Sequence, residues 1–201
     1  MSMNAQNQVE QPEHFEFTPE NLEKANQHIA KYPEGRQASA VMPMLDIAQR
    51  QSDGWLPQAA IRHVAGLLDM SVIRVLEVAS FYTMYNLEPV GKHFVQVCTT
   101  TPCWLRGSDD VVSACKSTLG VDMGETTDDG VFTIVEVECL GACANAPMMQ
   151  IGDDYYEDLD AASTEKLLNA LKAGETPEAG PQSARNKSEP AGGLTSLQEN
   201  A

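Results

Sequence analysis

The chain lacks a hydrophobic run long enough to cross a bilayer. A membrane-spanning helix needs about 18 or more consecutive apolar residues, and charged side chains interrupt even the apolar segment 72–78. The first 16 residues have no basic start and no apolar core, so they do not resemble an export signal. We therefore expect a cytoplasmic protein that reaches a membrane only through partner proteins.

Basic residues are also scarce. The chain has 13 Lys and Arg against 29 Asp and Glu, which gives a formal net charge of -16. A surface of this sign repels phosphate backbones and anionic lipid head groups. We expect no nucleic-acid binding and no direct membrane insertion.

Two phosphate-binding motifs are absent as well. The sequence has no Gly-x-Gly-x-x-Gly turn and no P-loop, the usual cradles for nucleotide phosphates. We therefore expect no nucleotide-cofactor site on this chain. The histidines are dispersed along the sequence, so we interpret them as surface or core residues and not as metal ligands or acid-base groups. They are His14, His28, His63 and His93.

The chemistry that is present lies in two close pairs of cysteines. Cys98 and Cys103 are separated by four residues, and Cys139 and Cys143 by three. A 2Fe-2S cluster needs four thiolates, two on each iron, and a gap of four residues occurs in plant-type ferredoxins. Gly141 in the second gap lets the backbone turn and point N–H groups at sulfur. The spacing is typical of an iron-sulfur site.

Other uses of the cysteines compete with this one. Structural zinc stays open, because it also takes four cysteines and tolerates gaps of two to four residues. Disulfides are disfavoured in a cytosolic protein, and a thioredoxin-type redox pair needs two intervening residues, which neither pair has. The fifth cysteine, Cys115, recurs with Val111 and Val112 at helical spacing. We expect it to be buried as a small apolar side chain and not to bind metal.

The first half of the chain is predicted to be helical. Thr18, Pro19 and Glu20 form a helix start, and apolar residues follow along one face. Pro43 falls inside a second helical pattern and should kink or restart that helix. The predicted helices span residues 19–31, 38–51, 57–68 and 71–79.

From His93 onward, strands alternate with helices. A strand at 94–97 ends at Cys98 and a strand at 131–137 leads to Cys139, so a rigid sheet can aim both pairs at one point. The other predicted elements are a helix at 108–119, a hairpin of 148–151 and 155–157, and a helix at 163–172, so that strands alternate with helices and the hairpin precedes the last helix. Beyond Gly174 the composition is too polar to repay the entropy of ordering, so a disordered tail is predicted.

Four segments of the sequence match one known family in order. They are Tyr-Pro-Glu-Gly-Arg at 32–36, Ser-Phe-Tyr-Thr-Met-Tyr at 80–85, Cys-Thr-Thr-Thr-Pro-Cys-Trp-Leu-Arg-Gly at 98–107 and Glu-Cys-Leu-Gly-Ala-Cys at 138–143. Over residues 15–172 the chain closely resembles the thioredoxin-like 2Fe-2S ferredoxin family of bacterial NADH-quinone oxidoreductase. The equivalent in mitochondrial respiratory complex I is the small flavoprotein subunit, and both cysteine pairs match without a gap.

The resemblance implies an α+β fold, with an N-terminal helical bundle followed by a thioredoxin-like α/β ferredoxin domain and a disordered C-terminal tail. The expected divisions are a flexible N-terminus at 1–17, a helical domain at 18–88, a thioredoxin-like 2Fe-2S domain at 89–174 and the tail at 175–201. The ligands it implies for one 2Fe-2S cluster are Cys98, Cys103, Cys139 and Cys143.

The resemblance also implies an electron-transfer role. The cluster is expected to exchange single electrons with the flavin of a partner NADH-binding subunit, in a respiratory complex that also contains a large iron-sulfur subunit. Such a complex places the chain peripherally on the cytoplasmic face of the bacterial inner membrane. Equivalent subunits of NAD-linked hydrogenases and formate dehydrogenases are the narrower alternative, and a non-redox zinc-binding module is the broader one.

Residues between the ligands are candidates for a second role. Residues 99–101 and 140–142 could supply backbone hydrogen bonds to the cluster sulfurs, with a plain loop role equally open. Trp104, beside the first pair, could shield the cluster from water or fill the core next to it, and we interpret it as a core side chain.

Overall fold

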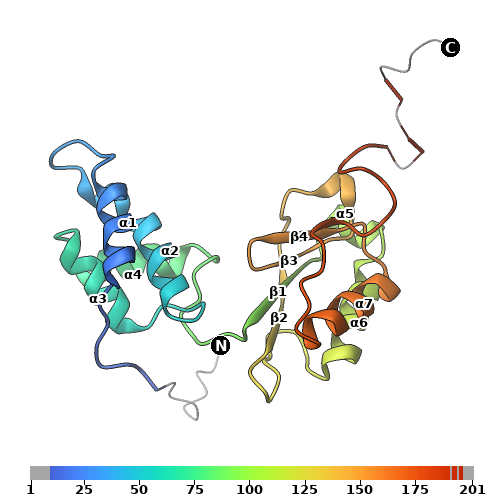
Figure 1. Cartoon of the computed structure of the whole chain (residues 1–201), viewed down its shortest axis with the longest axis horizontal. Coiled ribbons are helices and arrows are strands. Elements are labelled where there is room, and N and C mark those ends of the chain that lie inside the picture. Colours follow the sequence, from blue (N-terminus) through green and yellow to red (C-terminus); the bar gives the residue numbers. More distant parts are fainter. Residues whose placement is uncertain (1–9, 191, 194, 197–201) are drawn as a thin grey trace. The chain divides into compact units, whose positions relative to one another are not determined.

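The computed structural model describes residues 10–190, 192–193 and 195–196. The chain divides into two compact units, and the division falls between Val90 and Gly91. The first unit is helical and the second is built around a sheet (Figure 1). Within the described ranges, no helix is long and apolar enough to span a membrane.

The helical unit contains the four predicted α-helices. Its elements are α1 (Pro19–Ile29), the 3-10 helix η1 (Gln37–Ala40), α2 (Val41–Gln51), α3 (Gln58–Leu67) and α4 (Val72–Phe81). α1 begins where its cap predicts, because the Thr18 side chain accepts a hydrogen bond from Asn21 N at 3.3 Å. Pro43 lies in the first turn of α2, where an N–H would have no intrahelical partner. Pro43 therefore restarts the helix after η1, as predicted.

Aromatic residues before α1 belong to the core of this unit. Phe17 is buried and Phe15 packs against the same core, and both rings contact the imidazole of His63 edge to face. The prediction of a flexible N-terminus at 1–17 is wrong for Phe15 and Phe17, because these ring contacts hold the chain in place. Residues 1–9 of that prediction lie outside the described residues.

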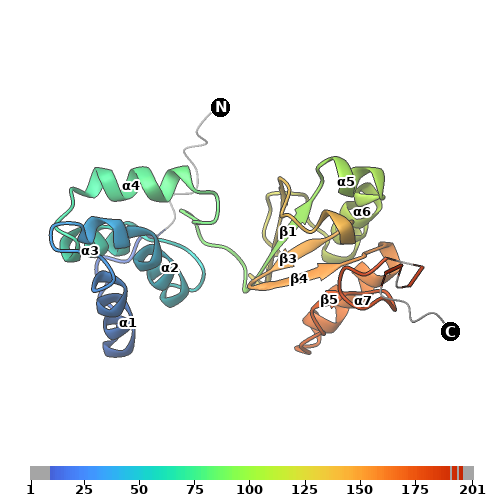
Figure 2. The same cartoon turned by 90° about the horizontal axis from the view of Figure 1, so that it is seen from above.

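The second unit is a mixed sheet with two helices on one face (Figure 2). The strand order is β2-β1-β3-β4-β5, with β1 parallel to β2 and antiparallel to β3. The strands are β1 (His93–Cys98), β2 (Phe132–Val137), β3 (Met149–Ile151), β4 (Asp154–Glu157) and β5 (Gly180–Pro181). The helices are α5 (Thr101–Leu105), α6 (Ser108–Leu119), α7 (Ala161–Lys172) and the 3-10 turn η2 (Cys143–Asn145). α6 and α7 bury apolar side chains against the strands in one core.

Local signals placed most of these elements. α6 has its predicted bounds and is closed by Gly120 in the left-handed conformation, φ 75°. α7 starts earlier than predicted because Asp160 caps it and accepts a hydrogen bond from Ser163 N at 2.7 Å. Two short elements, α5 and β5, were not predicted, since neither is long enough to show a period. With these two elements added, the order of strands and α-helices in this unit is β-α-α-β-β-β-α-β.

The chain after α7 differs from the predicted disordered tail, 175–201. β5 pairs in parallel with β4, and Gln182 N donates to Glu157 O at 2.8 Å. Farther on, the guanidinium of Arg185 forms an ion pair with Asp158. The prediction of a disordered tail is therefore wrong for residues 180–189. These residues are bonded to β4 and to Asp158. Residues 191, 194 and 197–201 lie outside the described residues.

Candidate iron-sulfur site

The parallel pairing of β1 and β2 brings the two cysteine pairs to the same end of the sheet. Cys98, the last residue of β1, lies opposite Val137, the last residue of β2. Cys139 follows in the loop directly after β2. Because the carboxyl ends of parallel strands meet at one edge, the loops that leave them start from neighbouring points. The register of the sheet therefore places both cysteine pairs close together, as the positions of the two strands in the sequence predicted.

Short helical turns carry the second cysteine of each pair. Cys103 lies in α5 and is buried, whereas Cys143 begins η2 and is exposed. Cys139 Sγ lies 3.3 Å from Cys143 Sγ, and the Cys98 and Cys103 thiols interact with each other. Cys98 also interacts electrostatically with both Cys139 and Cys143. All four predicted ligands lie together, and all are free thiols.

Backbone N–H groups lie against the sulfur atoms of Cys98, Cys103 and Cys139. Burial alone raises the pKa of Cys98, but hydrogen bonds from Thr100 and Leu140 bring it below its ordinary value. The backbone of Gly141 is the main cause of the lowered pKa of Cys139. These donors stabilise the thiolate, which is the form that binds metal. Thr100, Leu140 and Gly141 thus make backbone contacts of the kind predicted for the residues between the ligands.

The surroundings of the other two thiols raise their pKa values. Burial raises the pKa of Cys103 to about 12, and the adjacent Cys139 sulfur raises the pKa of Cys143. A bound metal ion deprotonates a coordinating thiol outright, because its positive charge outweighs such shifts. Each pair therefore combines one thiol of lowered pKa with one of raised pKa.

The grouping of the thiols in two pairs fits a centre with two irons. The Cys98 and Cys103 thiols interact with each other, and Cys139 Sγ lies 3.3 Å from Cys143 Sγ. A 2Fe-2S cluster takes two thiolates on each iron, which matches the two pairs. Hydrogen bonds to the sulfurs also suit this chemistry, since they stabilise and tune iron-sulfur centres.

An apolar wall closes one side of the site. Its buried members are Cys98, Cys103, Ala146 and Met148. Leu140, Ala142 and Tyr155 pack against it, and Tyr155 Oη donates to Leu140 O at 2.9 Å. That hydrogen bond fixes the loop whose N–H groups contact the sulfurs. No pattern in the sequence predicted this role for Tyr155.

The opposite side is open to solvent. Cys139 and Cys143 are exposed, and the residues after Cys103 point outward, with Trp104 58% and Leu105 71% exposed. The interpretation of Trp104 as a core residue is therefore wrong. α5 turns Cys103 inward, and the residues that follow it on so short a helix face away from the core. Exposed apolar side chains beside a redox site are typical of a docking surface.

The fifth cysteine is separate from this site. Cys115 is fully buried on α6 among apolar side chains of the sheet unit. Burial raises its pKa to about 12. The prediction that it is a core residue is confirmed.

Comparison with known families agrees with this geometry. The family model for thioredoxin-like [2Fe-2S] ferredoxins matches residues 25–172. The chain belongs to this family. The match covers both units and confirms the predicted α+β fold with a thioredoxin-like ferredoxin domain. It also names the cluster type that the cysteine spacing predicted.

Curated relatives of the family are similar over most of their length. The chain is 54% identical to an NADH-quinone oxidoreductase subunit of Rickettsia bellii, over 79% of this chain and 95% of the relative. It is 52% identical to NADH dehydrogenase [ubiquinone] flavoprotein 2, mitochondrial, of Dictyostelium discoideum, over 92% of this chain and 75% of the relative. These relatives confirm the predicted resemblance to the small flavoprotein subunit of complex I.

A solved structure with a similar fold is a crystal structure of an NAD+-reducing [NiFe]-hydrogenase in the air-oxidised state. It is 19% identical with a TM-score of 0.57, over 65% of this chain and 23% of the hydrogenase chain. A likeness at that identity concerns the fold alone. The relatives above 50% identity carry NADH dehydrogenase names, so the hydrogenase alternative is not favoured.

Sequence reasoning missed the C-terminal residues that reach this site. Arg185 Nη2 donates to Ala144 O at 2.6 Å, directly after Cys143. A basic residue in a strongly acidic chain was the only available signal, and composition assigned the segment to a disordered tail.

Proposed function

We propose that this chain is the electron-transfer subunit of an NADH-quinone oxidoreductase, with Cys98, Cys103, Cys139 and Cys143 as ligands of one 2Fe-2S cluster. When bound, the cluster supplies one-electron chemistry. The proposal rests on one observation: both cysteine pairs lie at the same end of the sheet, because β1 and β2 pair in parallel and end opposite each other. Relatives that are named as NADH-quinone oxidoreductase subunits support the choice of complex.

The residues of the chain perform three tasks in this role. The apolar wall around Cys98 and Cys103 keeps water from one side of the site. N–H groups of Thr100, Leu140 and Gly141 offset negative charge at the sulfurs. The side of the site with the exposed Cys139 and Cys143 faces a partner protein. Electrons pass most readily where little protein separates the cluster from the partner.

The partner that we propose is an NADH-binding flavoprotein subunit, next to a large iron-sulfur subunit of the same complex. The chain itself has no phosphate cradle for NADH or FMN. Trp104 and Leu105 beside the exposed ligands offer an apolar surface for that partner. Through the complex, the chain would lie on the cytoplasmic face of the bacterial inner membrane without a span of its own.

An anaerobic reduction assay tests this function. Adding NADH to the purified cluster-loaded chain is expected to leave the visible absorption unchanged, whereas further addition of the flavoprotein partner should bleach it and produce the reduced-cluster resonance. Dithionite serves as the control that the cluster can be reduced. Prompt reduction by NADH without the flavoprotein would contradict the proposed division of labour, and a colourless zinc-containing chain would contradict the cluster itself.

A further inference from the structure

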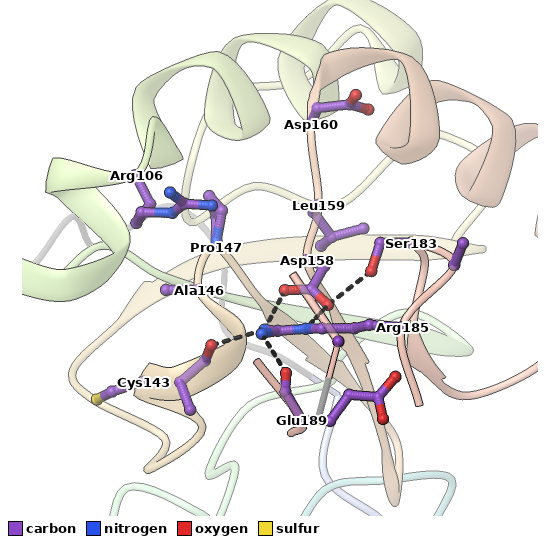
Figure 3. Close-up of a pocket in the computed structure, with 13 residues that line it drawn as sticks. Arg106, Cys143, Ala146, Pro147, Asp158, Leu159, Asp160, Ser183, Arg185 and Glu189 are labelled. Atoms are coloured by element: carbon purple, nitrogen blue, oxygen red, sulfur yellow. Dashed lines mark hydrogen bonds and ion pairs between the residues drawn. The ribbon is translucent and has the colours of Figure 1, made fainter. Parts of the chain in front are cut away.

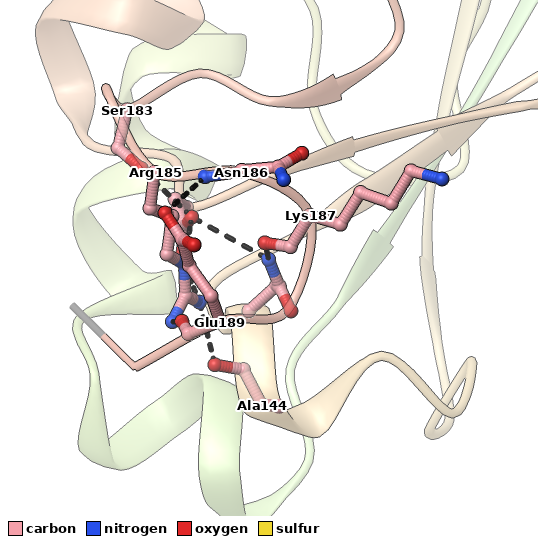
Figure 4. Close-up of polar contacts among 8 residues, drawn as sticks. Ala144, Ser183, Arg185, Asn186, Lys187 and Glu189 are labelled. Carbon is pink, nitrogen blue, oxygen red and sulfur yellow. Dashed lines mark hydrogen bonds and ion pairs between the residues drawn. The ribbon is translucent and has the colours of Figure 1, made fainter. Parts of the chain in front are cut away.

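The C-terminal segment 180–189, here called the strap, lies over the loop that carries Cys143. It leaves the sheet edge at β5, and its backbone then reaches η2 (Figure 4). Asn145 Nδ2 donates to Lys187 O at 2.8 Å, and Arg185 Nη2 donates to Ala144 O at 2.6 Å. Two residues directly after a proposed ligand are thus bonded to the strap.

Arg185 is the anchor of the strap. Its Nε donates to Asp158 Oδ2 at 2.6 Å, and its Nη2 also donates to Asp158 Oδ1. Nη1 donates to Glu189 O at 3.0 Å, so every guanidinium nitrogen has a partner (Figure 3). The side chains of Arg185 and Asp158 are only 14% and 12% exposed. A bidentate pair this well buried is more rigid than a surface ion pair.

Asp158 links this anchor back to the same loop. Its backbone N donates to Asn145 O at 2.7 Å, and its carboxylate also accepts a hydrogen bond from Ser183 Oγ at 2.9 Å. The η2 loop has few bonds of its own, chiefly Asn145 N to Ala142 O at 2.9 Å. The position of the η2 loop, which begins at Cys143, therefore depends on contacts from Asp158 and the strap.

A pocket lies behind Cys143 and is lined by Arg106, Asp158 and Arg185 among others. Each nitrogen of the Arg185 guanidinium already donates to a protein oxygen. Its geometry is that of a residue that holds other protein groups in place.

We propose that Arg185 is a positioning residue for the iron-sulfur site, which fixes the Ala144 carbonyl and through it the orientation of Cys143. This inference rests on the proposed function, because it requires the four cysteines to hold a cluster. The strap acts at a distance from the sulfur, as outer hydrogen-bond partners of metal ligands do. Loss of such partners typically weakens metal binding by about 10- to 100-fold.

The test compares three variants of the full-length, cluster-loaded chain. Arg185→Ala removes the anchor. Arg185→Lys keeps the charge, but one ammonium cannot span Asp158, Ala144 and Glu189 together. Lys187→Asn is the matched control: it removes a neighbouring positive charge, leaves the backbone bond from Asn145 intact, and places an Asn at a positive φ of 51°, which Asn tolerates.

Iron release to a chelator and the resonance of the dithionite-reduced cluster are measured beside the melting temperature. Arg185→Ala is expected to release iron about 10- to 100-fold faster and to shift the resonance, with Arg185→Lys between it and wild type and Lys187→Asn unchanged. If Arg185→Ala does not load a cluster, iron release and the resonance are compared between Arg185→Lys and Lys187→Asn, and a change in Arg185→Lys alone supports the proposal.

Two results would overturn the proposal. One is a wild-type resonance and release rate in the Arg185 variants, even with a lowered melting temperature, since that would make the anchor purely structural. The other is an equal effect of Lys187→Asn, since that would show a general charge effect. A wild-type chain without iron or resonance would instead refute the proposed function, so the two failures are distinguishable.

Discussion

The two cysteines of each pair have different surroundings. Cys98 and Cys139 receive backbone N–H bonds that lower their pKa values, whereas burial raises the pKa of Cys103 and the Cys139 sulfur raises that of Cys143. Because thiolates are the metal-binding form, the lowered pKa values suit Cys98 and Cys139 to the role of metal ligands.

Replacing a single ligand is expected to remove the cluster. Cys103→Ser and Cys139→Ser should each abolish or strongly reduce bound iron and acid-labile sulfide, because a hydroxyl is a poorer ligand for a soft metal centre. Cys115→Ser should keep iron and sulfide near the wild-type level. It should lower the stability by about 1–3 kcal/mol, since it buries a hydroxyl in an apolar core.

Iron and sulfide per chain are the measurements, with thermal unfolding recorded for all three variants. The Cys115 variant is the control, because it carries the same chemical change outside the site. An equal loss of iron from Cys115→Ser would refute the choice of four ligands.

Among the elements, the pairing of β1 with β2 is the one on which the site depends. The chain enters β1 through Gly91, whose N donates to Thr133 Oγ1 at 2.6 Å. A Cβ at Gly91 would lie 2.6 Å from the carbonyl carbon of Phe132 in β2. The glycine therefore permits a backbone approach that no larger residue allows without moving a strand.

Gly91→Ala is expected to destabilise the sheet unit by about 1–3 kcal/mol, because the added methyl group meets backbone and not a flexible side chain. Gly66→Ala, on α3 with open space around it, is the matched control. It should be neutral or stabilise the chain by about 0.5–1 kcal/mol, as expected for a glycine replaced inside a helix. Urea unfolding measures both, and a Gly91 variant as stable as wild type would show that β2 shifts at little cost.

The division of the chain into two units concerns the protein as a whole. The unit that begins at Gly91 contains the four proposed ligand cysteines, the sheet, α6, α7 and the strap. The two units have separate apolar cores. Among the described residues, those that hold the site therefore all come from the sheet unit.

We expect a fragment of residues 89–201, cut at the predicted domain boundary, to fold alone and to bind the cluster. The fragment of residues 1–88 is the control and should remain free of iron. Iron, sulfide and the visible circular dichroism of each fragment are compared with those of the full chain. A fragment 89–201 that stays unfolded or empty, while the full chain loads, would show that the units depend on each other.

Short-range patterns in the sequence determined much of this protein. Caps, apolar periodicity and glycine stops act within a few residues, so α1, α6 and α7 were placed with small errors. The spacing within each cysteine pair is local too, because two thiols a few residues apart already share a turn. The resemblance of whole segments then indicated the family and the cluster.

Contacts between distant parts of the chain decided the rest. Arg185 and Asp158 are 27 residues apart in sequence, and their ion pair orders a segment whose own composition is too polar to order itself. The outward direction of Trp104 depends on how α5 packs its other face, which a five-residue helix does not reveal by period. The N–H of Leu140 reaches the sulfur of Cys98 only because β1 and β2 pair in parallel. Composition and period describe neighbours along the chain, whereas these features depend on neighbours in space.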